Sequence, residues 1–331
     1  MLLGCWKGNQ FSKQVWRVYI VTWTERKEES ASRCHKLTTH INIPRFTPDD
    51  IDILVLPEMA FSGYRFKSKD HIKPYLEDAE TGTTVRWAKQ QAARLNAYVM
   101  VGYPQIVKGN PDKYYNSACF VAPSTEILAT YQKHFLYETD EAWAEEGPGF
   151  MSIDVPDLGK VGLGICMDLN PYRFEAPFTD FEFANFHREQ QSSIILCSMA
   201  WLGKDASEND SDQSDPSSGS GHDSNGEDDN VQDDDVMEVC NYWCMRLLPI
   251  YNDAWANNSI PETSQKIRRS IIFVACNRVG TEGGVTFGGS SSVFVLSNYR
   301  PLILDHLKSN EENVLIVKDE VFERTARFLN Q

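Results

Sequence analysis

Eight short apolar runs between residues 51 and 318 constrain the fold of this 331-residue chain more than any other feature. Most are rich in Val, Ile or Leu and are followed by turn-forming residues, which is the pattern of a buried β-strand. So many buried strands must pair into sheets whose faces are covered by other elements. The runs are IDILVLP (51–57), AYVMVGYP (97–104), SACFVA (117–122), VGLGIC (161–166), SIILCSMAW (193–201), SIIFVACN (270–277), SSVFVLS (291–297) and NVLIVK (313–318).

Two segments between the runs predict helices, at residues 80–97 and 178–191. Apolar residues fall on one helical face of the first segment: Val85, Ala88, Ala92 and Leu95. Residues 117–122 pair naturally with 126–131 as a hairpin. Strands that alternate with helices and include hairpins predict an α/β fold, a sandwich of sheets covered by helices.

The net charge of −15 is concentrated in one segment. Residues 205–235 hold twelve Asp or Glu and no Lys or Arg, which leaves only −3 on the other 300 residues. The remainder is therefore nearly neutral and offers no basic face for nucleic acid. We predict a disordered acidic insertion at 204–235 within a single domain formed by 46–203 and 236–322. A linker between two domains is the alternative.

The eight cysteines are widely spread, without a CxxC pair or a Cys/His zinc spacing. We therefore expect free thiols in a reducing compartment and no metal site. No run approaches the roughly 18 apolar residues of a membrane-spanning helix, so no membrane partner is expected. Residues 1–24 lack acidic side chains and carry three basic ones, as mitochondrial presequences do. An irregular start explains them equally well, so we expect a cytoplasmic location, with a mitochondrial one as the alternative.

Three strand ends each carry one candidate reactive group. Glu58 follows a buried strand in LVLPEMAFSGY, Lys133 follows the hairpin in ATYQKHFLYETDEAW, and Cys166 ends a strand in GLGICMD. Taken singly, the glutamate and the lysine are typical of solvated loops and the cysteine of a core position. Composition and spacing alone do not choose between these interpretations and a catalytic one.

The motifs LPEMAFSGY, YQKHFLY and GICMDLNPY resemble the glutamate, lysine and cysteine motifs of the nitrilase superfamily, the carbon–nitrogen hydrolases. They occur in the family's order and with similar spacing. The stretches KHFLYETDEAW, ICMDLNPYRFEAPFTDFEF and CSMAWL are most similar to the fungal protein N-terminal asparagine amidohydrolases. The resemblance covers roughly residues 50–203 and 240–318. It implies a four-layer α-β-β-α sandwich.

The resemblance implies deamidation of N-terminal asparagine, and of glutamine as a further candidate, through a cysteine thioester. Glu58 would act as the base for the Cys166 thiol, because a thiol with a pKa of about 8.5 is a weak nucleophile at neutral pH. Lys133 and the backbone N–H of Met167 would stabilise the oxyanion. No cofactor is required, and the product would feed N-terminal-residue-dependent degradation. Alternatives are another amidase of the superfamily (ω-amidase, carbamoylase or nitrilase) and a catalytically impaired scaffold.

A second carboxylate commonly supports the lysine in this family. Asp140, Glu141, Glu145 and Glu146 compete for that role, and we favour Glu141, eight residues past Lys133. A solvated acidic loop is the alternative interpretation of this cluster.

A substrate that begins with asparagine carries an α-ammonium group, which a buried anion would suit. We predict that Asp168 binds this group, with Ser62 or Tyr64 nearby and Trp201 lining the pocket. Alternatively, Asp168 only caps the turn after the nucleophile, and Trp201 is a core residue.

Residues 1–45 depart from the family pattern. VWRVYIVTW (15–23) could form the family's first strand, but the helix expected after it is broken. Either this region diverges or the gene model is wrong at its start. Without the first strand an inner sheet would be incomplete, and the loop that carries Glu58 could be misplaced.

Overall fold

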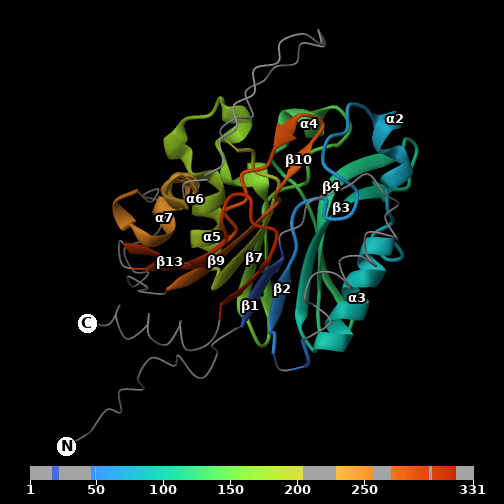
Figure 1. The fold of residues 1–331 in the computed structure, drawn as a ribbon. Helices are drawn as coiled ribbons and strands as arrows, with labels where there is room; N and C mark the ends of the chain where they lie inside the picture. Colours follow the sequence, from blue (N-terminus) through green and yellow to red (C-terminus); the bar gives the residue numbers. More distant parts are fainter. Residues whose placement is uncertain are drawn as a thin grey trace, which may run out of the picture.

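The computed structural model describes residues 17–21, 46–48, 50–203, 229–255, 270–297 and 300–317. Two six-stranded sheets form its centre (Figure 1). The first has the order β14 (Val314–Val317), β1 (Val18–Val21), β2 (Ile53–Val55), β3 (Tyr98–Val107), β4 (Lys113–Val121) and β5 (Ile127–Gln132). The second has the order β13 (Arg300–His306), β12 (Ser292–Ser297), β9 (Ile271–Asn277), β8 (Ile194–Met199), β7 (Gly159–Ile165) and β6 (Met151–Val155).

All eight predicted strands are confirmed, and the hairpin is formed by β4 and β5. Two further strands, β6 and β13, lie at the edges of the second sheet. Their side chains are mostly half-buried, and neither sequence holds an apolar run as long as those singled out: β6 reads MSIDV and β13 reads RPLILDH. A small hairpin of β10 (Thr281–Glu282) and β11 (Val285–Thr286) was also not predicted.

Strand β1 occupies the position at which the family's first strand is expected. It pairs parallel with β2 and antiparallel with β14, and Val18 and Ile20 are buried. The sheet beside the Glu58 loop is therefore continuous. The helix expected after this strand falls in residues 22–45, which lie outside the described residues, so the divergence of 1–45 stays a prediction.

Successive side chains of a β-strand point to opposite faces, so the two faces of the first sheet contribute to two different cores. Val55 and Phe120 face the second sheet and share a core with Leu163 and Ile165. The opposite face packs against α3 (Thr83–Leu95), the first predicted helix, whose four predicted face residues are all buried.

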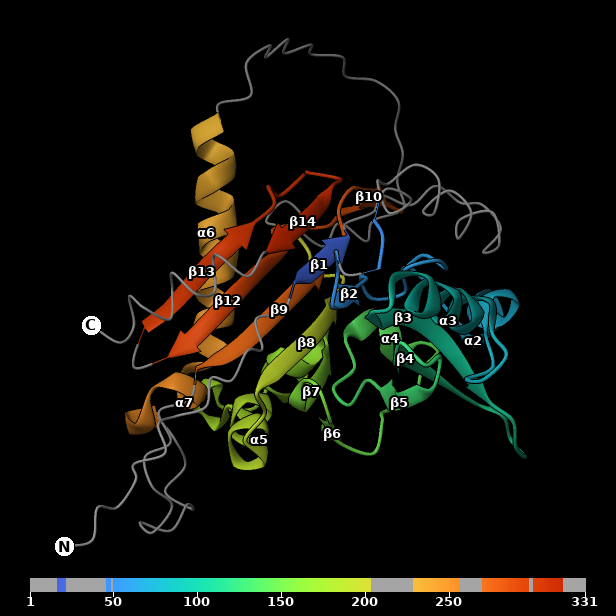
Figure 2. The same ribbon diagram turned by 90° about the horizontal axis from the view of Figure 1, so that it is seen from below.

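Helices α5 (Glu182–Gln190), α6 (Asp229–Arg246) and α7 (Leu248–Tyr251) cover the second sheet, on the side away from α3 (Figure 2). The four-layer α-β-β-α sandwich is thus confirmed. None of the helices in the described ranges combines the length and hydropathy needed to cross a bilayer.

Helix α6 corrects the predicted boundary of the acidic insertion, because it begins at Asp229 rather than after residue 235. Val236, Cys240 and Trp243 recur at helical spacing and are fully buried, so packing extends the helix back into the acidic run. The rest of the predicted insertion, 204–228, lies outside the described residues.

Candidate active site

The three candidate reactive groups lie just beyond the ends of three strands. Glu58 follows β2 by three residues, Lys133 follows β5 directly, and Cys166 follows β7 directly. Cys166 opens a short 3-10 turn, Cys166–Leu169. Because the two sheets pack face to face, strand ends from both sheets meet in one buried site.

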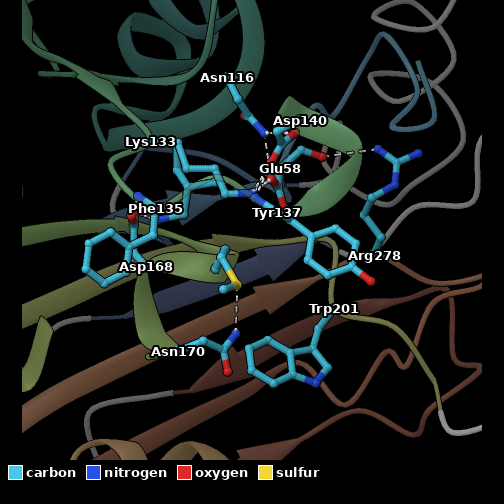
Figure 3. Close-up of polar contacts among 12 residues, drawn as sticks. Glu58, Asn116, Lys133, Phe135, Tyr137, Asp140, Asp168, Asn170, Trp201 and Arg278 are labelled. Carbon is cyan, nitrogen blue, oxygen red and sulfur yellow. Dashed lines mark hydrogen bonds and ion pairs between the residues drawn. The ribbon is translucent and has the colours of Figure 1, made fainter. Parts of the chain in front are cut away.

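A compact polar cluster surrounds the Lys133 ammonium (Figure 3). Its Nζ lies 2.7 Å from Glu58 Oε1 and 2.5 Å from Asp140 Oδ2. Asn116 Nδ2 donates to the same Glu58 oxygen at 2.7 Å and to Asp140 Oδ1 at 3.1 Å. All four side chains are at most 1% exposed, so solvent does not screen their interactions.

Opposing effects set the charges of this cluster. Burial disfavours the Lys133 ammonium most strongly, but attraction to Asp140 and Glu58 together outweighs it and raises the pKa of Lys133 well above its ordinary value. Burial also raises the pKa of Glu58, while Lys133 and the Asn116 hydrogen bond lower it. Glu58 Oε2 is buried and has no hydrogen-bond partner among the described residues. A carboxylate oxygen in this state is well suited to accept a proton.

Cys166 has a φ of 41°, a left-handed conformation that is rare for a residue with a side chain. Such a conformation persists only where the surrounding structure holds it. Burial raises the pKa of the Cys166 thiol, and the Glu58 charge adds to this, while Lys133 and a backbone hydrogen bond from Ala200 lower it. The resting thiol is therefore protonated, and its use as a nucleophile requires a base.

Asp168 holds the strained turn in place. Its Oδ1 accepts the backbone N–H groups of His134 and Phe135, and its Oδ2 accepts the Ile165 N–H and the Tyr131 hydroxyl. One fully buried carboxylate thus ties the end of β7 to the end of β5. The distance between Cys166 and Lys133 depends on this link.

Beside Cys166 lies a small, mainly apolar cavity of about 160 Å³. Aromatic rings form much of its wall, and none of the described residues that line it carries a carboxylate. The lining residues are Tyr64, Tyr137, Cys166, Met167, Asn170, Phe174, Ala200, Trp201 and Leu202.

The model of the carbon–nitrogen hydrolase family matches residues 19–171. A protein N-terminal amidase of Schizosaccharomyces pombe is 32% identical over 281 residues, which cover 80% of this chain and 86% of that protein. The chain belongs to the carbon–nitrogen hydrolase family. A second protein N-terminal amidase, from Saccharomyces cerevisiae, is 37% identical over 169 residues, covering 46% of this hydrolase and 36% of that protein.

Solved structures of N-terminal amidase share the fold of this hydrolase. One with an Asn-Glu-Ala peptide superposes with a TM-score of 0.72 at 23% identity, over 92% of this chain and 97% of that one. Another with a Gln-Val peptide superposes with a TM-score of 0.73 at 22% identity over the same shares. At these identities the likeness establishes the fold. The predicted family is confirmed.

The structure contradicts the choice of Glu141 as the supporting acid. Its side chain is 43% exposed and pairs with Arg173 at 2.8 Å, whereas the neighbouring Asp140 contacts Lys133. Consecutive residues of the one-turn helix α4 (Glu138–Glu141) point in different directions, so only one of them faces the cluster. The two later candidates also turn outward, Glu145 to Lys113 and Glu146 to the Tyr172 hydroxyl.

The structure also contradicts the prediction that Asp168 binds an α-ammonium group. Four donors already occupy its two oxygens, and it does not line the cavity. The alternative, a capping role, is the observed one. Tyr64, Met167 and Trp201 do line the cavity, whereas the Ser62 hydroxyl bonds backbone carbonyls of its own loop.

Two residues that contact Glu58 were not singled out from the sequence. Asn116 directly precedes the apolar run SACFVA (117–122), where no residue was singled out. Arg278 is fully buried, and its guanidinium donates to the carbonyls of Glu58 and Met59 at 3.2 and 2.9 Å. An arginine directly after the apolar run SIIFVACN (270–277) was the available signal, since an arginine at the end of a buried strand needs partners.

Proposed function

We propose that this hydrolase deamidates the side chain of an N-terminal asparagine or glutamine of a protein or peptide, releasing ammonia. The observation that carries the proposal is the buried Glu58–Lys133 pair beside Cys166, in a chain related over most of its length to a protein N-terminal amidase. The product, an N-terminal Asp or Glu, would feed N-terminal-residue-dependent degradation.

The proposed reaction starts when Glu58 Oε2 takes the Cys166 proton. The thiolate attacks the side-chain amide carbon, and the Lys133 ammonium and the Met167 N–H hold the resulting oxyanion. Preorganised donors of this kind are typically worth about 3 kcal/mol each. The C–N bond then breaks, and the nitrogen leaves as ammonia with the proton that Glu58 carried.

A water completes the proposed cycle. Glu58, again a carboxylate, takes a proton from the water, whose oxygen attacks the thioester carbon. The C–S bond breaks, the acid product leaves, and the proton returns to Cys166. Asp140, in place of Glu141, keeps Lys133 charged and oriented throughout.

We infer that aromatic rings, rather than Asp168, receive the α-ammonium group of the substrate. Tyr64, Tyr137, Phe174 and Trp201 line the cavity, and ring faces attract cations within about 6 Å of their centres. Met167 forms a further part of the wall. For location we keep the cytoplasmic proposal, since a reducing compartment preserves a nucleophilic thiol.

The decisive assay measures ammonia release from a peptide beginning with Asn, its N-acetylated form and a peptide with an internal Asn. Wild type should turn over only the first. Cys166→Ala should reduce kcat by about 10⁴-fold or more, as expected for loss of a nucleophile. Cys244→Ala, which removes another buried thiol away from the cavity, is the matched control and should retain activity.

Preference for the acetylated peptide or for simple free amides would contradict the N-terminal specificity and favour another amidase branch. Retained turnover in Cys166→Ala would contradict the thioester chemistry.

A further inference from the structure

Among the described residues that line the cavity, Asn170 is the one with a side-chain amide. It is 3% exposed, and its Oδ1 accepts a 2.7 Å hydrogen bond from the Tyr242 hydroxyl. Its Nδ2 has only the Met167 sulfur as a partner among the described residues, at 3.5 Å. A thioether is a weak acceptor, so a buried N–H donor group lies at the cavity without a strong partner.

Helix α6 determines which end of this amide faces the cavity. The Tyr242 hydroxyl donates to Oδ1, which leaves the NH₂ group toward Met167 and the cavity. The Tyr242 ring also packs on Trp201, with centroids 5.4 Å apart, and Trp243 packs on the same indole at 5.9 Å. In Figure 3, Asn170 and Trp201 lie together, on the far side of the site from Lys133.

We propose that Asn170 Nδ2 donates a hydrogen bond to the main-chain carbonyl oxygen of the substrate's first residue. Tyr242 is the positioning residue that holds the amide in this orientation. The inference rests on the proposed function and adds a specificity-determining contact to it.

The hydrogen-bonding inventory of the substrate leads to this assignment. Its α-ammonium group has only donors, which a facing N–H group repels. Its side-chain carbonyl must reach the oxyanion donors near Lys133, on the other side of the site. The main-chain carbonyl is the acceptor that remains, and it is present in every peptide substrate whatever its second residue.

Two small amides separate this contact from the others. Asn-Gly contains the ammonium group, the side-chain amide and the main-chain carbonyl. In 3-aminobutanamide a methyl group replaces the main-chain carbonyl and the glycine that follows it, while the ammonium group and the primary amide remain. The measurements are kcat and KM for Asn-Gly, and the Ki of 3-aminobutanamide as a competitor of Asn-Gly turnover.

Asn170→Ala and Tyr242→Phe should each raise the KM for Asn-Gly about fivefold to tenfold, the effect of one lost hydrogen bond, with little change in kcat. The Ki of 3-aminobutanamide should change less than about twofold, because this compound lacks the acceptor. Asn170→Asp should raise the KM for Asn-Gly further, since a carboxylate oxygen would face the carbonyl.

Tyr251→Phe is the matched control. Its hydroxyl donates to the Cys244 carbonyl at 2.9 Å, so the variant removes a comparable hydrogen bond at the same helical layer but not at the cavity. The KM for Asn-Gly and the Ki of 3-aminobutanamide should both stay at wild-type values in this variant.

A parallel rise in the KM for Asn-Gly and the Ki of 3-aminobutanamide would overturn the inference, because Asn170 would then act on the ammonium group or only on packing. An unchanged KM in both variants would overturn it as well. These outcomes leave the proposed function intact. If wild type releases no ammonia from Asn-Gly, the proposed function fails, and the inference fails with it.

Discussion

The two oxygens of the Glu58 carboxylate have different surroundings. Oε1 accepts from Lys133 and Asn116, whereas Oε2 has no partner among the described residues. One oxygen therefore fixes the position of the carboxylate, and the other is available for proton transfer. The same contacts also adjust the pKa of Glu58 in opposite directions.

These contacts predict opposite shifts in the pH dependence of activity. Glu58 must be ionised to act as a base, so kcat/KM is lost as the pH falls through its pKa, which burial raises above 4.5. Asn116→Ala removes a hydrogen bond that lowers this pKa, so the acid limb should move to higher pH. Asp140→Asn removes a negative charge that raises it, so the limb should move to lower pH.

The measurement is kcat/KM for an Asn peptide across the acid range in the three proteins. Asp140→Asn should also lower kcat, by about 10- to 100-fold, because Lys133 loses its second carboxylate. If both limbs move in the same direction, Glu58 is not the group that titrates.

At the scale of secondary structure elements, close approach of β3 to the Glu58 loop shapes the site. A Cβ atom on Gly102 would lie 2.6 Å from the Met59 nitrogen and 2.7 Å from the Glu58 Cα, both shorter than real contacts. The absence of a side chain at Gly102 thus lets the loop that follows β2 rest directly on β3.

Gly102→Ala should therefore displace Glu58 without abolishing the fold. A misplacement of about 1 Å typically costs about 10²-fold in rate, so we expect kcat to fall by that order. Gly109→Ala, in the exposed turn between β3 and β4, is the control and should retain wild-type kcat. Circular dichroism should show that both variants are folded. A wild-type kcat in Gly102→Ala would contradict the conclusion that the close contact between β3 and the Glu58 loop positions Glu58.

At the scale of the whole molecule, the second sheet holds the backbone that leads from β2 to Glu58. Carbonyls at or beyond the end of a strand need new partners when they are buried. Ser198 and Cys276, from β8 and β9, donate to the carbonyls of Leu56 and Val55. Arg278 continues the series at Glu58 and Met59.

Arg278→Lys tests whether this inter-sheet contact positions Glu58. An ammonium group keeps the charge but lacks the planar fork that reaches two carbonyls and Glu282 together. We expect kcat to fall about 10-fold or more, with a smaller change in KM. Arg188→Lys is the control, because Arg188 likewise donates to a backbone carbonyl and a carboxylate, but on the outer helix α5.

Equal kcat losses in the two lysine variants would indicate general destabilisation rather than positioning of Glu58. Melting temperatures measured alongside separate the two effects, since only the Arg278 variant should lose rate beyond its loss of stability.

Local signals in the sequence were sufficient for the buried strands, helix α3 and the three strand-end residues. Apolar runs with turn formers report burial directly, because each run lies within one element. The edge strands β6 and β13 were not predicted, because half-buried strands do not contain long apolar runs. The acidic insertion was predicted to extend to residue 235, past the start of α6 at Asp229, because acidic residues are typical of disorder and the described buried face of α6 begins at Val236.

The sequence by itself determined the family, the sandwich and the positions of Glu58, Lys133 and Cys166 at strand ends. Each of these motifs lies within one short continuous segment, so no contact between distant segments is needed to find it. Only the tertiary structure decided that Asp140 rather than Glu141 supports the lysine, and that Asp168 is already occupied by four donors. Such assignments depend on which side chains from distant segments meet, and on how many hydrogen bonds each has left. The spacing of residues along the chain predicts neither these contacts nor the number of hydrogen bonds that each side chain can still make.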